Sequence, residues 1–452
     1  MLGSPRSGRG RHKGIAVRPE AIREARLEKG LSLAEVAGDD VTRAAIHLVE
    51  TGKMRPSMRT LELIAQRTGR PVSYFMQAHG SEAQKAACEE LSRLVDTGNY
   101  HEAVQLGNRL LGEGLEAAVE AEVRFGLGRA LVRMVDGTAA LEHLPRARQL
   151  FERLGDSWMV ARVLEQQANA MFLAGDPRAL GCALEALERC ERLEPADPTL
   201  RATVLNHIGS IHMRSRDWHN AARFFEMGLA VREELVSLRL RARLHDGLTA
   251  AYQYLGDFKG ARRSAERAYA LYTVDADVSG LIRAENNLGY VLLQQDELEA
   301  AAPHLHRALD LCEERDAAPL LRAYTLNSLG ELHIALGEPD VARAYLLRSL
   351  GVARGLGERG TEATARHLLG TASVELGYED AADEWFRSAI ELLSQLDLVE
   401  RLRSCAAEYA ELLYRRRRLD ESVTYWRVAA GAANRTARPA AVDESRMDGA
   451  SA

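Results

Sequence analysis

Apolar residues recur every three to four positions along most of the chain, which is the spacing of amphipathic helices, and almost no stretch alternates as a strand would. Over residues 18–78 these periodic segments are short and separated by capping signals. Over residues 82–433 they are longer and come in pairs. The pattern predicts an all-α protein with a small five-helix domain, here called the head, followed by a repeat array.

The head contains two short helices joined by a tight turn. Ser32 and Glu35 have the spacing of a capping box, which predicts a helix start, and Thr42 is the predicted cap of the following helix over residues 43–51. Gly52 closes that helix at a position that needs a left-handed backbone. Because Ile46 supplies the inward face, the first turns of this helix face outward, a geometry that fits a DNA major groove.

These motifs give the head a resemblance to the Cro/repressor type of helix-turn-helix, the XRE family. The matching positions are Leu31-Ser32, Glu35-Val36-Ala37, Thr42-Arg43, Ile46, Glu50-x-Gly52-Lys53, Pro56-Ser57, Leu61, Ile64-Ala65 and Val72-Ser73-x-Phe75. The resemblance implies that the helix over residues 43–51 reads a double-stranded DNA operator. It implies base contacts from Arg43, Ala44, His47 and Leu48, and phosphate contacts from Thr42, Lys53 and Arg55. Arg43 is the best base reader, since its guanidinium can take guanine O6 and N7 together.

Three positions depart from the family pattern. Leu33 stands where a phosphate-contacting Gln is common, Leu48 stands where a polar base reader is common, and the turn at residues 38–41 is about one residue short. These departures leave the fold prediction intact and leave base-by-base specificity unassigned. The alternative is a head that serves as a protein-contact or dimerisation module without DNA.

The array repeats with a period of about 40 residues. A turn signal, often Gly-Asp or Gly-Asn before an aromatic residue, recurs at Gly98, Gly137, Gly175, Arg216, Gly256, Gln295, Gly337, Gly377 and Arg417. Each period holds a first helix, the turn and a second helix that contains Ala, a bulky residue and Ala. Small residues allow helices to approach closely, and large ones fill the space between hairpins.

This pattern resembles tetratricopeptide repeats. The signature is a Leu-Gly pair in the first helix, found at Ile208-Gly209, Leu288-Gly289, Leu329-Gly330 and Leu369-Gly370. The resemblance implies a right-handed α-solenoid of about eight to nine helical hairpins, with an inner face formed by the first helices. The first two hairpins and the last match the signature poorly, as end units often do.

One polar column follows the repeat register along the first helices. Its members are Asn206, Asp246, Asn286, Asn327 and His367. An Asn side chain both donates and accepts hydrogen bonds, so a ladder of them can pair with the main chain of an extended peptide. By resemblance to peptide-binding tetratricopeptide proteins, the column is a candidate peptide site, with Arg243, Arg283 and Tyr290 nearby. The alternative is that these side chains bond neighbouring helices or water.

Charge is divided unevenly along the chain. Residues 1–78 carry 14 Lys and Arg against 8 Asp and Glu, a net charge of +6, whereas the rest carries 45 against 57, a net charge of −12. The basic end can approach phosphate and the acidic remainder would be repelled by it. Residues 1–17 are expected to form a disordered basic arm, either near DNA phosphates or inert, and residues 434–452 a disordered tail.

The remaining sequence signals argue against catalysis. The five cysteines form no CxxC pair, the histidines lack metal-ligand spacing, and no phosphate-binding Gly-rich loop or nucleophile elbow is present. The chain has no apolar run of membrane-spanning length and no signal sequence. We expect no enzyme activity, cofactor or metal, no membrane association, and a cytoplasmic location.

The two modules together indicate a DNA-binding regulator whose array binds a peptide or protein segment. The layout resembles the peptide-sensing quorum regulators of Gram-positive bacteria, the RRNPP group, which are dimeric, and this implies a homodimer and a peptide ligand. The alternative is an interaction scaffold in which the array captures a partner protein and the head serves localisation or a regulatory contact.

Overall fold

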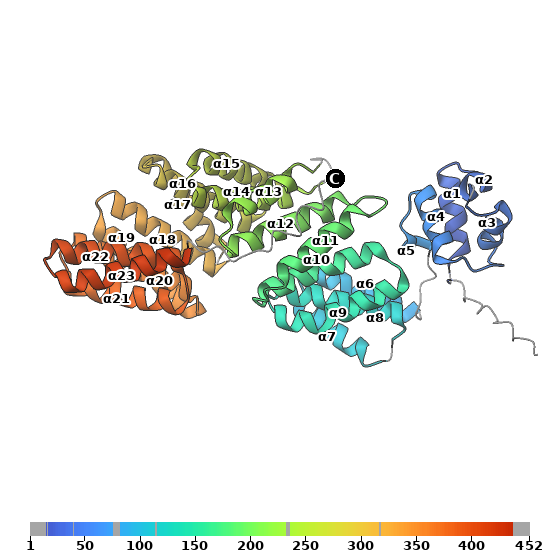
Figure 1. Cartoon of the computed structure of the whole chain (residues 1–452), viewed down its shortest axis with the longest axis horizontal. Coiled ribbons are helices and arrows are strands. Elements are labelled where there is room, and N and C mark those ends of the chain that lie inside the picture. The colour runs from blue at the N-terminus through green and yellow to red at the C-terminus, as the bar shows by residue number, and fades with distance from the viewer. Residues whose placement is uncertain are drawn as a thin grey trace, which may run out of the picture. The chain divides into compact units, whose positions relative to one another are not determined.

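The computed structural model describes residues 15, 17–38, 40–75, 82–113, 115–231, 236–315 and 318–436. Within them the chain is helical, with an isolated bridge at Val17 and no strand (Figure 1). The all-α prediction is therefore confirmed. The predicted arm over residues 1–17 lies outside the described residues except Ile15 and Val17, and Val17 packs in the core of the head. The predicted tail lies outside them from residue 437 onward.

The head consists of five short helices, as predicted. They are α1 (Pro19–Glu28), α2 (Leu33–Ala37), α3 (Arg43–Glu50), α4 (Met58–Thr68) and α5 (Val72–Phe75). Three of them begin at a side chain that accepts a hydrogen bond from the first turn, since Ser32, Thr42 and Ser57 cap α2, α3 and α4. A small core that includes Ile22, Ile46 and other apolar residues holds the five helices together.

The array consists of nine helical hairpins in the described part of the chain. They are α6 (Glu82–Asp96) with α7 (Tyr100–Leu111), α8 (Ala117–Arg133) with α9 (Gly137–Leu154), α10 (Ser157–Leu173) with α11 (Ala179–Glu191), α12 (Pro198–Arg214) with α13 (Trp218–Leu229), α14 (Leu238–Leu255) with α15 (Phe258–Asp275), α16 (Val278–Gln294) with α17 (Leu298–Arg315), α18 (Pro319–Ala335) with α19 (Pro339–Leu356), α20 (Arg359–Glu375) with α21 (Glu379–Gln395), and α22 (Val399–Arg415) with α23 (Leu419–Thr436). Consecutive helices pack on one another from α6 to α11 and from α13 to α23.

Every hairpin turns at one residue in the left-handed backbone region. The nine residues are Gly98, Val135, Gly175, Arg216, Gly256, Asp296, Gly337, Gly377 and Arg417. Eight of these positions coincide with the predicted breaks or lie one residue away. The second differs: Val135 takes the left-handed backbone, whereas Gly137 is the first residue of α9. A Cβ at Gly137 would lie 2.3 Å from the carbonyl oxygen of Ala170, so this glycine serves close helix packing.

The glycine of the Leu-Gly signature is also a packing residue. A Cβ at Gly330 would lie 2.4 Å from Leu346 Cδ2 on the second helix of the same hairpin, and one at Gly289 would lie 2.6 Å from Leu305 Cγ. The second helix can therefore approach only where the first has no side chain. The chain divides into two compact units, residues 1–211 and 212–452, and the second contains α14–α23.

Candidate functional site

The third helix of the head has one buried and one exposed face. The hydroxyl oxygen of Thr42 accepts a hydrogen bond from the amide of Ala45 at 3.1 Å and so fixes the start of the helix. Ile46 and Val49 are fully buried. The side chains of the predicted base-reading set, Arg43, Ala44, His47 and Leu48, are all exposed on the opposite face.

Three basic side chains lie at or just after this helix. Arg43, Lys53 and Arg55 are exposed, and none of them forms an ion pair with the described residues. Three other arginines of the head are paired with carboxylates, in Arg26–Glu50, Arg67–Asp40 and Arg70–Glu28. Uncompensated positive charge therefore lies beside the exposed face of α3, where an anionic ligand would meet it.

Leu33 stands where the helix-turn-helix pattern commonly has a glutamine. Its side chain is half-buried and packs against the core of the head beside Val36. It therefore adds apolar contact where the family pattern has a polar residue. The start of α2 is held by a capping box, in which hydrogen bonds from Ser32 keep the pKa of Glu35 below its usual value.

A groove with a volume of about 680 Å³ lies in the second compact unit. Its lining comes mainly from the first helices of five successive hairpins, α14, α16, α18, α20 and α22. The groove brings together five of the residues expected at a peptide site: Arg283, Asn286, Tyr290, Asn327 and His367. Tyr254, Tyr324 and Glu331 also line it.

Three residues expected at the peptide site are placed elsewhere. Asn206 belongs to α12 in the first compact unit, and Arg243 is an exposed residue of α14 outside the groove lining. Asp246 also does not line the groove. Its carboxylate accepts hydrogen bonds from the Tyr272 hydroxyl at 2.8 Å and from Arg283 Nε at 3.4 Å. Burial raises the pKa of Asp246, and these hydrogen bonds oppose that effect.

Arg283 belongs both to this buried group and to the groove. Its Nη2 donates to the hydroxyl oxygen of Tyr272 at 3.0 Å, and its guanidinium carbon lies 5.5 Å from the centroid of the Tyr272 ring. Burial lowers the pKa of Arg283, but the Asp246 carboxylate outweighs it and the pKa is raised. Asp246 therefore positions Arg283 at the wall of the groove.

Two asparagines of the column carry unpartnered amide oxygens. Asn327 is 6% exposed, and its Nδ2 donates to the carbonyl oxygen of Thr361 at 3.2 Å. The Oδ1 atoms of Asn327 and Asn286 are buried and have no hydrogen-bond partner among the described residues. Buried polar atoms are nearly always paired, so these two acceptors are candidates for a hydrogen bond from a ligand or from water.

His367 lies in an acidic part of the groove. Its Nε2 is 2.7 Å from Glu408 Oε2, and Thr371 donates to Glu408 Oε1 at 2.6 Å. Burial raises the pKa of Glu408, but the hydrogen bond and charge of His367 outweigh it and keep the pKa below its usual value. Burial also raises the pKa of Glu331, which accepts a hydrogen bond from Gln294 at 3.2 Å.

Sequence patterns alone did not identify Glu408. It lies on α22, where the Leu-Gly signature is absent, so no register pointed to it. Only its contact with His367 across two hairpins reveals its relation to the groove. The described residues contain no group of three His, Cys, Asp or Glu side chains arranged to hold a metal ion. None of their helices is both long and apolar enough to cross a membrane.

Comparison with protein families identifies both modules. A helix-turn-helix family model matches residues 22–75, and tetratricopeptide repeat models match residues 201–239, 280–354 and 320–395. The predicted combination of an XRE-type helix-turn-helix with tetratricopeptide repeats is therefore confirmed. No characterised protein matches the chain in sequence.

Several solved structures share the fold. The apo form of RapI is 14% identical with a TM-score of 0.59, covering 79% of this chain and 99% of RapI. The apo form of the quorum sensor NprR from B. thuringiensis is 13% identical with a TM-score of 0.57, covering 83% and 100%. The Rap conjugation gene regulator of plasmid pLS20, in complex with the Phr* peptide, is 13% identical with a TM-score of 0.53, covering 81% and 100%.

Proposed function

We propose that this chain, which joins a helix-turn-helix domain to tetratricopeptide repeats, is a sequence-specific transcription regulator that binds a duplex operator and responds to a peptide or protein segment in its groove. The observation that carries the proposal is the uncompensated charge of Arg43, Lys53 and Arg55 around the exposed face of α3. Cationic side chains that are not already neutralised gain most from phosphate, because each contact releases condensed counterions.

The proposed DNA contacts divide by chemistry. Lys53 and Arg55 follow α3 and take phosphates, which fixes the register of the head on the duplex. Arg43, in the first turn of α3, reads guanine through its two parallel N–H donors. Ala44 and Leu48 are exposed and apolar, so they suit thymine methyl groups. This assignment gives Leu48 a base-reading role that needs no polar atom.

The proposed ligand is an extended segment held by its main chain. The unpartnered oxygens of Asn286 and Asn327 accept hydrogen bonds from backbone amides, which supplies affinity without side-chain specificity. The groove volume of about 680 Å³ lies in the usual range for ligand sites, and tyrosines along the wall can pack ligand side chains. The NprR and pLS20 relatives are named as a quorum sensor and as a complex with a peptide, which agrees with a ligand of this kind.

Ligand binding can alter the array because the groove crosses five hairpins. A solenoid is held only by contacts between neighbouring repeats, so small rotations at each one add along its length. A ligand that fits one curvature better than another shifts the population toward it. A shift in the population of array curvatures would then change how the full chain binds its operator.

The direct test of the proposed function is recovery and sequencing of DNA bound to the full chain in cells, with the Arg43→Ala variant in parallel. Discrete enriched sites with a shared motif, lost in the variant, support a sequence-specific regulator. Uniform recovery, or the same sites with both proteins, contradicts it. For the groove, the full chain is used to select binders from a random library of short peptides. Selected peptides that bind Asn286→Ala as tightly as wild type contradict the proposed groove.

A further inference from the structure

One carboxylate in the groove lacks a cationic partner. Two carboxylates, Glu331 and Glu400, belong to the groove lining. Glu400 lies 3.3 Å from the guanidinium of Arg403. Glu331 accepts a hydrogen bond at 3.2 Å from the Gln294 side-chain amide, a neutral group, and forms no ion pair with the described residues. A partly buried carboxylate without a cation loses hydration and gains no attraction in return, so a cation that enters the groove is drawn to Glu331.

The two arginines of the groove lining do not supply that cation. Arg283 is paired with Asp246. Arg401 donates to two neutral oxygens, the carbonyl of Gly360 at 3.4 Å and the hydroxyl of Thr364 at 3.2 Å. Neither guanidinium is therefore bonded to the unpaired carboxylate.

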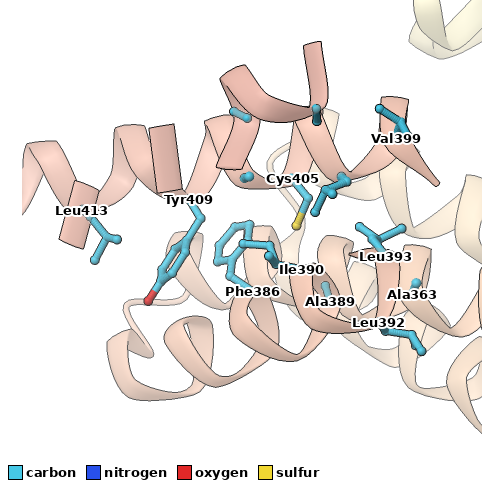
Figure 2. Close-up of a cluster of buried hydrophobic side chains, with 14 of the residues drawn as sticks. Ala363, Phe386, Ala389, Ile390, Leu392, Leu393, Val399, Cys405, Tyr409 and Leu413 are labelled. Carbon is cyan, nitrogen blue, oxygen red and sulfur yellow. The ribbon is translucent and has the colours of Figure 1, made fainter. Parts of the chain in front are cut away.

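His367 is held on a different carboxylate, that of Glu408, at 2.7 Å. The ring centroid of His367 lies 5.9 Å from that of Phe386. Phe386 in turn stacks on Tyr409 at 5.1 Å, in the apolar cluster that joins α21 to α22 (Figure 2). This cluster fixes both His367 and Glu408, the neighbour of Tyr409 in the chain. Even with His367 protonated, Glu331, Glu408 and His367 carry two negative charges against one positive, a net charge of −1.

Two neighbours of Glu331 suit the remainder of a basic side chain. Asn327 lies one helical turn before Glu331 on α18, is 6% exposed, and has a buried Oδ1 atom without a hydrogen-bond partner among the described residues. Tyr290 also lines the groove. Burial raises the pKa of Tyr290 and the charge of Glu331 raises it further, which places the ring near the carboxylate. An aromatic ring packs well against the methylene groups of lysine or arginine.

We propose that Glu331, Asn327 and Tyr290 form a seat, here called the acid seat, for one lysine or arginine side chain of the segment that binds in the groove. This inference rests on the proposed function, since it specifies the ligand of the same groove. The basic group pairs with Glu331 while its aliphatic stem lies on Tyr290. An amide oxygen accepts two hydrogen bonds, so Asn327 takes the basic group beside a backbone amide. An acidic side chain at this place is rejected by Glu331 and Glu408.

The test selects binders from a random heptapeptide library on the full-length wild-type chain and on three variants. Peptides selected on the wild type should share lysine or arginine at one aligned position. Glu331→Gln should lose this enrichment, and Glu331→Arg should select acidic residues at that position instead. Glu384→Gln, which removes an exposed carboxylate of α21 outside the groove lining, is the matched control and should select as the wild type does. Circular dichroism checks the folding of each variant.

Isothermal titration then measures one selected peptide in three forms. Replacement of its basic residue by norleucine should weaken binding to the wild type about tenfold, the effect of one lost charged hydrogen bond. The same replacement should leave the affinity for Glu331→Gln unchanged. Acetylation of the peptide's amino terminus should not weaken binding, because the seat takes a side chain.

Thermal unfolding without peptide gives a readout that needs no ligand. Glu331→Gln removes an unpaired charge and keeps an acceptor for Gln294, so it should raise the unfolding midpoint while it weakens binding of the basic peptide. A lower midpoint would show that Glu331 serves the fold and would overturn the acid seat.

The selection separates failure of the acid seat from failure of the groove. Peptides selected without a shared basic residue, or a norleucine form that binds as tightly as its parent, contradict the acid seat and leave the groove standing. Loss of binding on acetylation would mean that the cation is an amino terminus, and the assignment to a side chain would be wrong. A wild-type chain that selects no peptide contradicts the proposed groove and the acid seat together.

Discussion

Arg26 and Glu50 form a bidentate ion pair that fastens α1 to the end of α3. Arg26 Nε lies 2.6 Å from Glu50 Oε1, and Arg26 Nη2 lies 2.9 Å from Glu50 Oε2. Their side chains are only 12% and 4% exposed. The hydrogen bond to Glu50 is the largest effect on the pKa of Arg26 and raises it. The helix proposed to read DNA is therefore held by a shielded pair on its buried side.

Removal of one partner should destabilise the head. Glu50→Ala leaves the Arg26 guanidinium shielded from water without its carboxylate, and breaking such a pair costs about 3 kcal/mol. Hydrogen exchange of the α3 amides should accelerate accordingly. Glu28→Ala is the matched control, because it breaks the exposed Arg70–Glu28 pair, which is worth less than about 1 kcal/mol. Equal acceleration in the two variants would show that the Arg26–Glu50 pair has no special role.

Alanine substitutions of the two groove asparagines should both weaken ligand binding, but only one of them should lower the stability of the chain. For peptides selected on the wild-type chain, Asn286→Ala should weaken binding about tenfold, the effect of one lost hydrogen bond. Asn327→Ala should weaken binding similarly and also lower stability by about 1 kcal/mol, because its bond to the Thr361 carbonyl is lost. Isothermal titration and thermal unfolding measure the two effects. Asn99→Ala, at an exposed residue outside the groove, should change neither.

The two glycine classes of the array should respond oppositely to alanine. Gly330→Ala places a methyl group against Leu346 and should destabilise the chain by about 1–3 kcal/mol through overpacking. Gly351 is helical and exposed with nothing within 4 Å of an added Cβ, so Gly351→Ala should stabilise by about 0.5–1 kcal/mol. Denaturant unfolding of both variants tests this. The same sign of change in both would mean that the signature glycine has no packing role.

His245 should make stability depend on pH below neutrality. Burial, reinforced by the charges of Arg267 and Arg241, lowers the pKa of His245 to about 4. As the pH falls from about 6.5 to 4, the unfolded chain takes up a proton at this site that the folded chain refuses, so stability is lost over that window. His245→Gln should reduce the loss by up to about 3 kcal/mol. His219→Gln, at an exposed histidine, should leave the pH profile as in the wild type.

Most of the fold could be predicted because helix caps and the repeat period determine where its helices begin and where its hairpins lie. Caps at Ser32 and Thr42 fixed the head, and the period of about 40 residues located hairpins even where the turn residue was Arg216 or Asp296. Periodicity could not show which residue of the second hairpin adopts the left-handed backbone of the turn. Val135 turns the second hairpin, although Gly137 looked the better candidate, because helix packing at Gly137 requires the missing side chain.

The candidate groove was predicted less completely than the fold. The repeat register specifies which residues share one face of a helix, but it does not specify which side chains of neighbouring helices contact that face. Asn286 and Asn327, two members of the column, line the groove. Asp246 shares their register, but Tyr272 reaches it from the second helix and removes it from the surface. Glu408 carries no repeat signature and meets His367 only through folding. Contacts with long side chains of other helices therefore determine which residues of the column line the groove, and the repeat pattern does not specify these contacts.

Direct binding of the purified full chain to its own upstream DNA, followed by fluorescence anisotropy against salt concentration, tests the central claim. Wild type should bind one fragment tightly, with an affinity that falls steeply as salt rises. Arg43→Ala should lose about 1–3 kcal/mol on that fragment. Arg23→Ala, which removes the same charge from an exposed site on α1, should lose much less. If no upstream fragment shows salt-dependent binding, or if the two variants bind alike, the DNA-reading account is wrong.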